Sequence, residues 1–170
     1  MFPSCEGLDR LRGLRVSDVM SREVISIPHH ATLCEAAEML TSAGTSGAPV
    51  VDEAGRCIGM ISSRDYLRQH AASCQLAAAP GSACASDDMT PIRHYMAPAV
   101  QSIDSGASLM QAARVMCLEH IHRLVVLDER ATPVGVLTTL DIVAALMAVA
   151  DEERQALRRN ANGRQAKGVL

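Results

Sequence analysis

Apolar and polar residues follow one order along the chain, and that order occurs twice. In the first copy, Glu23–Ile27 is rich in β-branched residues and predicts a strand, which Pro28 interrupts. A helix is expected from Thr32, because Glu35 completes a capping box, and Gly44 ends the helical pattern. A hairpin and a second helix then follow, over Ala48–Val51, Cys57–Ile61 and 63–72. The predicted order is therefore strand, helix, strand, strand, helix.

The second copy has the same order. It contains a strand at Val100–Ile103, a helix with a capping box at Ser108 and Gln111, strands at Arg123–Leu127 and Val134–Leu137, and a helix from Thr139. This last helix is expected to run past Ala150 into the charged segment Asp151–Arg159, with Asn160–Leu170 frayed. The predicted organisation is a lead-in (1–15), a first repeat (16–72), a linker (73–91), a second repeat (92–150) and an extension (151–170). In the lead-in, Leu8, Leu11 and Leu14 share one helical face that can pack on the body.

A short motif at the end of each hairpin aligns the two copies. Gly59-x-x-Ser62-x-x-Asp65 returns as Gly135-x-x-Thr138-x-x-Asp141, at an offset of 141 − 65 = 76 residues, and 20–67 aligns with 96–143 without a gap. A repeat of about fifty residues is too small to bury both faces of its sheet. We therefore expect an α+β fold, in which two β-α-β-β-α repeats pack sheet to sheet with pseudo-twofold symmetry around a central cleft.

Composition narrows the class of partner. The net charge is −3 with mixed signs, and the aromatic residues are only Phe2, Tyr66 and Tyr95, which argues against nucleic-acid binding. The longest uncharged apolar run, Ile142–Ala150, is too short to cross a bilayer, and the first fifteen residues lack the apolar run of a signal peptide. Six cysteines form no C-x-x-C motif and are expected to be reduced, with Cys34, Cys57 and Cys117 in apolar segments and buried. A soluble, cytoplasmic protein is predicted.

The motifs together resemble the tandem cystathionine β-synthase-type (CBS) module, also called a Bateman module, over roughly 16–149. The residues that carry the resemblance are Asp18-Val19-Met20, Ala48-Pro49-Val50-Val51-Asp52 and the Gly59 motif, then His122-Arg123-Leu124-Val125-Val126-Leu127-Asp128 and the Gly135 motif. Each motif is short, and the match rests on their order, spacing and duplication. In the alignment of the two repeats, Val125 occupies the position of Pro49, and His122-Arg123 occupies the position of Ser46-Gly47. The two sites are therefore expected to differ.

The resemblance implies an adenosine-containing ligand, such as AMP, ADP, ATP, NAD or S-adenosylmethionine, in the cleft between the repeats. Carried over, Asp65 and Asp141 would hold ribose hydroxyls. The hydroxyl and phosphate contacts would come from Ser62, Thr138, Arg64, His122 and Arg123. The adenine pocket would be lined by Val24, Ile25, Ala48 and Pro49 in the first repeat, and by Val100, Leu124 and Val125 in the second.

Simpler roles remain open for each of these residues. The Ser62/Asp65 and Thr138/Asp141 pairs are also ordinary capping boxes, which stabilise a helix without any ligand. Arg64 and Arg123 can be solvated or ion-paired. The histidine pairs His29-His30 and His120-x-His122 have no carboxylate or cysteine at a matching spacing, so no metal site is predicted.

The favoured function is a stand-alone regulatory module that signals ligand binding to an unknown partner protein. No nucleophile motif, Walker loop or G-x-G-x-x-G is present, so we predict no enzyme activity and no catalytic cofactor. The alternative is a dimerising scaffold that has lost its ligand. The resemblance also implies a homodimer, which fits the apolar faces of the second helix of each repeat, at Tyr66, Leu67, Ile142, Val143 and Leu146.

Overall fold

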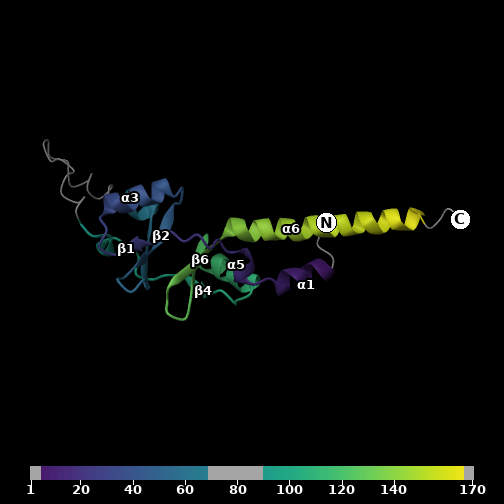
Figure 1. Cartoon of the computed structure of the whole chain (residues 1–170), viewed down its shortest axis with the longest axis horizontal. Helices are drawn as coiled ribbons and strands as arrows, with labels where there is room; N and C mark the ends of the chain where they lie inside the picture. Colours follow the sequence, from purple (N-terminus) through teal and green to yellow (C-terminus); the bar gives the residue numbers. More distant parts are fainter. Residues whose placement is uncertain (1–4, 69–89, 167–170) are drawn as a thin grey trace. The chain divides into compact units, whose positions relative to one another are not determined.

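The computed structural model describes residues 5–68 and 90–166, with two three-stranded sheets and the helices that cover them (Figure 1). The fold is α+β, as predicted. The helices are α1 (Cys5–Gly13), α2 (Val16–Val19), α3 (Leu33–Ser42), η1 (Ile92–His94), α5 (Leu109–Leu118) and α6 (Thr139–Ala166). The strands are β1 (Ile27–Pro28), β2 (Gly47–Val51), β3 (Cys57–Ser62), β4 (Ser102–Asp104), β5 (Arg123–Leu127) and β6 (Pro133–Thr138). A further helix begins at Ser63 and is described as far as Arg68. Within these ranges, no helix is long and apolar enough to span a membrane.

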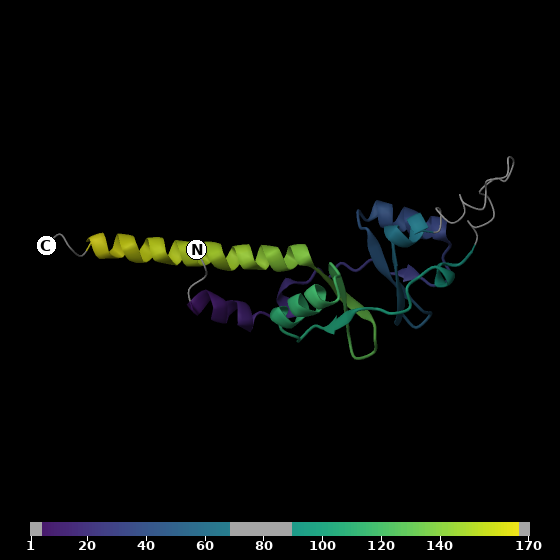
Figure 2. The ribbon, with the colours of Figure 1, turned by 180° about the vertical axis from the view of Figure 1, so that it is seen from behind.

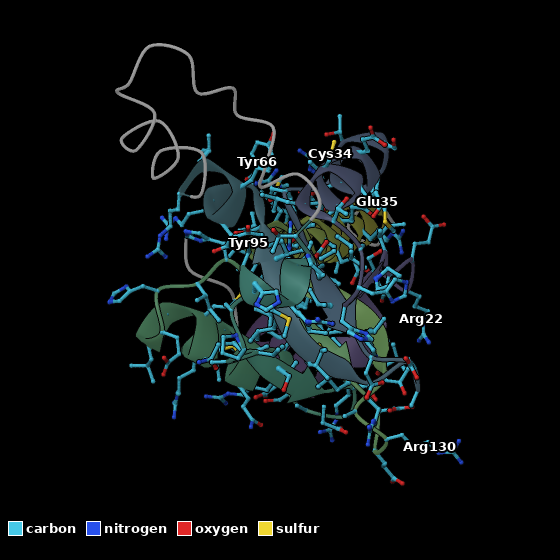
Figure 3. The ribbon with its side chains drawn as sticks, turned by 90° about the vertical axis from the view of Figure 1, so that its left-hand side faces the viewer. Arg22, Cys34, Glu35, Tyr66, Tyr95 and Arg130 are labelled. Atoms are coloured by element: carbon cyan, nitrogen blue, oxygen red, sulfur yellow. The ribbon has the colours of Figure 1, made fainter. Side chains whose placement is uncertain are left out.

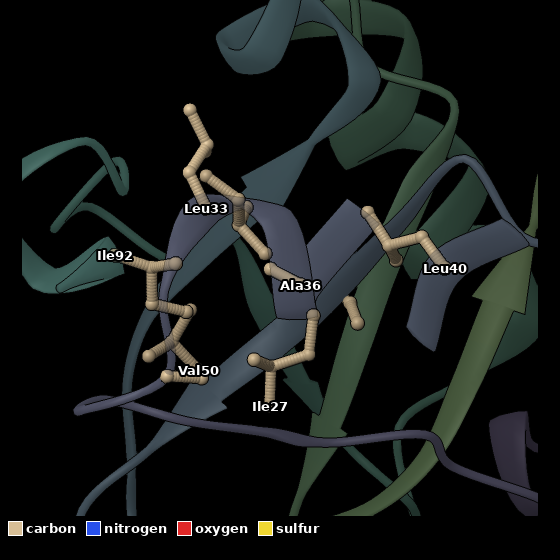
Figure 4. Close-up of a cluster of buried hydrophobic side chains, with 9 residues drawn as sticks. Ile27, Leu33, Ala36, Leu40, Val50 and Ile92 are labelled. Atoms are coloured by element: carbon tan, nitrogen blue, oxygen red, sulfur yellow. The ribbon is translucent and has the colours of Figure 1, made fainter. Parts of the chain in front are cut away.

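The first sheet has the order β1-β2-β3, with β1 parallel and β3 antiparallel to β2. Helix α3 lies on this sheet, because its apolar residues recur on one side. Figure 4 shows Leu33, Ala36 and Leu40 of α3 directed at Ile27 and Val50 of the strands, with Ile92 at the edge of the cluster. Tyr66 and Tyr95, both labelled in Figure 3, pack against the same cluster and are partly buried.

The second sheet repeats this arrangement in the order β4-β5-β6. The middle strand, β5, has three consecutive fully buried residues, Leu124, Val125 and Val126. Leu109, Ala112 and Met116 form the buried side of α5, at the positions of Leu33, Ala36 and Leu40 in the first repeat. The hydrophobic pattern of the two repeats therefore encodes the same local packing twice.

The opening segments of the two repeats (15–21 and 91–97) are exchanged. Ser21 of the first repeat pairs with Val136 of the second, and Ala97 of the second pairs with Met60 of the first. At the other end of each segment, Arg15 pairs with Ser108 and Pro91 pairs with Thr32. All four contacts occur at equivalent positions of the 76-residue alignment. Each hairpin is therefore extended by a segment from the opposite repeat.

This exchange explains the two compact units of the chain, which cut across the repeats. Unit I contains Met1–Ser21, Ile103–Leu124 and Val136–Leu170, and unit II contains Arg22–Ser102 and Val125–Gly135. The repeated glycine of the hairpin is part of the same exchange. A Cβ atom on Gly59 would lie 2.5 Å from Sδ of Met96 and 2.9 Å from the carbonyl oxygen of Ala97. Gly59 thus provides the room that the opening segment of the second repeat needs.

Four residues with positive φ also recur at the 76-residue offset. Gly44 and His120 follow α3 and α5 with φ of 62° and 53°, and Gly55 and Ala131 lie in the hairpin turns with φ of 77° and 61°. Glycine adopts this conformation without steric conflict, whereas a residue with a Cβ is strained. The fold therefore requires the same two backbone conformations in each repeat, and the second repeat adopts them without glycine.

The N-terminal helix α1 packs on α6 within unit I, as Figure 1 shows. Leu11 and Val149 are buried, the Arg10 guanidinium lies 2.6 Å from the Glu152 carboxylate, and Gly7 is in contact with the Glu153 side chain. The prediction that the lead-in packs back on the body is therefore correct for this helix.

Three local predictions were wrong. The predicted strand Glu23–Ile27 is restricted to β1, because only Ile27 and Pro28 pair with β2, and Pro28 is tolerated since β1 is an edge strand. The predicted strand Val100–Ile103 is β4, shifted to Ser102–Asp104. The segment expected to fray continues α6 to Ala166, since alanine, glutamine and arginine there favour a helix.

The expected burial of the cysteines was also wrong for two of them. Cys34 and Cys117 are exposed, because they lie on the sides of α3 and α5 that face away from the sheets. Cys57 is half-buried in β3, and burial raises the pKa of its thiol, although a hydrogen bond with the Gly59 backbone opposes that shift. These three residues are thiols, and Cys5, Cys74 and Cys84 lie outside the described side chains.

Candidate ligand site

Each repeat ends its hairpin in a hydroxyl–carboxylate pair at the start of a helix. In the first repeat, Oδ2 of Asp65 accepts hydrogen bonds from the Ser62 backbone N–H at 2.9 Å and from the Ser62 hydroxyl at 2.6 Å. In the second, Oδ2 of Asp141 accepts from the Thr138 backbone N–H and hydroxyl, both at 2.7 Å. The Asp141 backbone N–H donates back to Thr138 Oγ1 at 3.3 Å, which completes a capping box.

Both carboxylates retain one oxygen for another partner. Oδ1 of Asp65 and Oδ1 of Asp141 accept no hydrogen bond from the described residues, and both side chains are partly exposed. A carboxylate oxygen held in place by its neighbour suits a ligand hydroxyl pair, because it accepts hydrogen bonds and the hydroxyls donate them. Helix capping and ligand binding are therefore compatible at each aspartate.

The residue just before the middle strand of each sheet, Ser46 or His122, lies beside the start of the second helix of its repeat. The carbonyl of Ser46 accepts the Ser63 N–H at 2.9 Å, and the carbonyl of His122 accepts the Thr139 N–H at 3.1 Å. The structure therefore brings the His122 backbone next to the Thr138/Asp141 box. Arg123 is half-buried in β5, whereas Arg64 is exposed. In the first repeat, Ser46 replaces the imidazole, so the two helix starts differ in chemistry.

A groove lies between the two helices of each repeat, within one compact unit in both cases. The groove of the first repeat, about 340 Å³, is lined by α3 residues and by Thr45, Ile61, Ser62, Ser63 and Tyr66. The groove of the second repeat, about 530 Å³, lies between α5 and α6 and is lined by Met116, Cys117, His120, His122, Thr139 and Val143 among others. Ser62 and His122 are the predicted ligand residues that line these grooves.

The seven residues predicted to line an adenine pocket differ widely in exposure. Ala48, Pro49, Leu124 and Val125 are buried in the middle strands, Val24 and Val100 are half-buried, and Ile25 is 42% exposed. In the first sheet, Ala48 and Pro49 pair with Ile61 and Met60, one and two residues before Ser62. The pairing places this part of β2 beside the Ser62/Asp65 box.

One repeated carboxylate has a purely structural role. Oδ1 of Asp52 accepts the backbone N–H groups of Ala54 and Arg56, and Oδ1 of Asp128 accepts those of Arg130 and Thr132. The backbone hydrogen bond from Arg56 is the main reason that the pKa of Asp52 is lowered, and the Arg56 side chain, 2.8 Å from Oδ2, adds to it. The duplicated aspartate after the middle strand therefore holds the hairpin turn together. Figure 3 shows Arg130 of the second turn pointing outward.

His120 was not predicted as a special position. It has a positive φ and lines the second groove. In the sequence, the only sign of this backbone conformation is that His120 aligns with Gly44 of the first repeat. Among the described residues, no three His, Cys, Asp or Glu side chains are arranged to hold a metal ion.

The chain is similar in sequence to several curated proteins. The uncharacterised protein MJ1232 of Methanocaldococcus jannaschii is 27% identical over 138 residues, which is 81% of this chain and 41% of the relative. The chain therefore spans less than half the length of the first curated relatives that it matches.

Two solved structures show the fold. The CBS domain pair of protein MJ0100, in complex with 5′-methylthioadenosine and S-adenosyl-L-methionine, superposes with a TM-score of 0.66 at 23% identity, over 79% of this chain and 97% of that one. CBSX2 in complex with AMP gives a TM-score of 0.67 at 22% identity, over 81% and 99%. The CBS domain family model matches twice, at residues 16–71 and 92–148. The chain is therefore a member of the CBS domain family, with two CBS domains in tandem.

Proposed function

We propose that the chain is a regulatory module that binds an adenosine-containing ligand through the Asp65 and Asp141 boxes and signals to a partner protein. The observation that carries this proposal is the geometry of the two boxes, in which one carboxylate oxygen is fixed by the cap and the other accepts no bond from the described residues. The family supports the ligand class, since the solved pairs MJ0100 and CBSX2 hold adenosyl ligands or AMP. AMP, ADP, ATP, NAD and S-adenosylmethionine are the candidates.

The second repeat is the better site for a phosphorylated ligand. His122 lies beside the Thr138/Asp141 box and is exposed, whereas the first repeat has Ser46 at that position. The N-terminus of α6 adds the positive end of a helix dipole. Ser62, Arg64 and Arg123 are proposed as further polar contacts, and the residues named above as the apolar wall for the base.

The proposed role is regulatory and not catalytic. Proteins with CBS domain pairs are typically regulatory, and the matched relatives that are enzymes, such as the homoserine O-acetyltransferase of Methanohalophilus mahii, are covered by this chain over only 24% of their length. The ligand would act by binding two conformations of the protein with different affinity. We propose a cytoplasmic location.

Calorimetric titration of the purified protein with the five ligands tests the proposal. We expect at least one to bind with a dissociation constant below millimolar, and Asp141→Asn to weaken phosphorylated ligands more than Asp65→Asn does. Thr32→Ala is a matched control, because Thr32 and Glu35 form the same kind of capping box at α3, outside the proposed site. Equal losses of affinity in the control and in the aspartate variants, or no binding by any of the five ligands, would contradict the proposal.

A second candidate function is a ligand-free dimerising scaffold. Two observations favour it. The first repeat has Ser46 where the second has His122, and the carboxylates of Asp65 and Asp141 already accept hydrogen bonds from the hydroxyls of their own boxes. A scaffold would melt at the same temperature with every nucleotide, whereas a sensor saturated at a hundredfold excess over its dissociation constant gains about 2.7 kcal/mol of stability. A homodimer is proposed for both functions, because Leu67, Val143 and Leu146 are exposed on the second helices. Tyr66 and Ile142 were predicted on the same apolar faces, but both are partly buried, and Tyr66 packs against the core of the first repeat.

A further inference from the structure

The grooves of the two repeats occupy equivalent positions but differ in size. Tyr66 of the first groove corresponds to Ile142 of the second at the 76-residue offset. Tyr66 also packs against the core of the first repeat, so its ring takes up space at that position. Isoleucine has no ring, and the second groove is larger, at about 530 Å³ against about 340 Å³. The second repeat therefore has room for a small molecule.

Polar and apolar residues are separated along the second groove. His120, His122 and Thr139 lie at the end where α5 stops and α6 begins, and the His122 carbonyl accepts the Thr139 N–H at 3.1 Å. Ala113 and Val143 lie more than one turn further into α5 and α6. The two helices contact each other within unit I, which Figure 2 shows from behind. The groove therefore has a polar end and an apolar body.

The polar end of the second groove offers hydrogen-bond donors and no carboxylate. An imidazole donates from one ring nitrogen when it is neutral and from both when it is charged, and the Thr139 hydroxyl is a further donor. None of the described residues that line this groove is Asp or Glu. A ligand carboxylate suits such donors, because an ionised carboxylate only accepts hydrogen bonds.

His120 holds a strained backbone conformation at this end of the groove. Its φ is 53°, and the first repeat has Gly44 at the equivalent position, with a φ of 62°. Glycine adopts this conformation freely, whereas a residue with a Cβ is strained in it. Strain of this kind is concentrated at functional sites, where the side chain has a use. At His120, the side chain that glycine could not supply is an imidazole in the groove.

We propose that the second groove binds a small organic acid with an apolar chain. Its carboxylate accepts hydrogen bonds from His120 and His122. Its chain lies against the apolar residues further into the groove, Met116, Ile142 and Val143. The inference goes beyond the proposed function and does not rest on it, because none of the residues proposed for ribose or adenine lines this groove. His122 is shared with the proposed phosphate contact, so His120 is the residue that distinguishes the two sites.

An NMR titration of the full chain with octanoate tests the proposal, because the imidazole Cε1–H signals report on each histidine. We expect the His120 and His122 signals to shift with a dissociation constant below about 1 mM. His94 lies in unit II, outside the groove, and its signal should not shift. 1-Octanol has the same chain without the carboxylate and should bind about tenfold more weakly. Unshifted His120 and His122 signals, or equal binding of octanol, would overturn the proposal.

His120→Gly separates the loss of the imidazole from the relief of strain. It should raise the melting temperature and weaken octanoate binding about tenfold. Ala131→Gly is the matched control, because it relieves the same strain in a hairpin turn outside the groove, and its affinity should stay within about twofold of the starting protein. His120→Asn should keep part of the affinity, since asparagine tolerates this conformation and donates a hydrogen bond. Unchanged affinity in His120→Gly, or an equal loss in Ala131→Gly, refutes the role of His120.

Ile142→Tyr tests where the chain of the acid lies. It places in the second groove the side chain that the first repeat has as Tyr66, so octanoate should bind at least about tenfold more weakly. Leu146→Tyr is the control, because Leu146 is exposed on α6 and does not line the groove. Circular dichroism shows whether each variant keeps its fold. Equal losses in the two variants, or full affinity in Ile142→Tyr, would show that the groove is not the binding site.

Discussion

At the scale of single residues, Gly59 shows how closely the two repeats constrain each other's sequence. We expect Gly59→Ala to destabilise the protein by about 1–3 kcal/mol, because the new methyl group meets Sδ of Met96 and the backbone oxygen of Ala97. Chemical denaturation measures the change. Gly13→Ala is the control, since no atom lies within 4 Å of its Cβ position, and it should stay within about 1 kcal/mol of the starting protein. Equal effects of the two substitutions would show that Gly59 is not needed for close packing.

Ala131 is the residue for which we expect a stabilising substitution. Its φ of 61° strains an alanine, so Ala131→Gly should raise the free energy of unfolding by about 0.5–1 kcal/mol, after the greater entropy of glycine in the unfolded chain is subtracted. The equivalent turn gives the opposite test. Gly55→Ala, at φ 77°, should lower the stability by about 1 kcal/mol, and two changes of the same sign would contradict the argument.

At the scale of elements, the capping box of α3 links stability to pH. The backbone N–H of Thr32 and then its hydroxyl lower the pKa of Glu35 below its ordinary value of 4.5. A lowered carboxyl pKa contributes stability above the unfolded pKa, and that contribution is lost as the pH falls through the folded value. Glu35→Gln should therefore be less stable than the starting protein near neutral pH, and the difference should shrink below about pH 4.5. Thermal melts across this range check the prediction, and a pH-independent difference would contradict it.

The elements also show how far the sequence predicts the fold. Strand β5 and the start of α3 agree with the prediction, because local signals define them: a β-branched run and the Thr32/Glu35 capping box. The boxes of the candidate site were predicted for the same reason, since Ser62 and Asp65 interact over three residues. The short β1 was not predicted, because its bounds depend on which residues pair with β2. The exposure of Cys34 depends on which side of α3 faces the sheet.

At the scale of the whole molecule, what the sequence did not predict is the exchange of the opening segments. Duplication indicates two similar repeats, but no local pattern shows that Ser21 pairs with Val136 and Ala97 with Met60. The same holds for His120 and Ala131, because only glycine signals a positive φ in a sequence. Most of the features of the fold that the sequence did not predict therefore depend on contacts between distant parts of the chain.

The exchanged segments have a consequence for how the chain folds. A chain cut between the repeats yields two pieces, each of which lacks a strand partner that the other one carries. Neither piece can be completed alone, so folding is cooperative across the duplication, and the long-range pairing makes it slower than the folding of two separate small domains. Deleting either copy therefore removes a strand partner from the other, whereas a substitution confined to one helix start, such as Ser46 against His122, leaves the exchange intact.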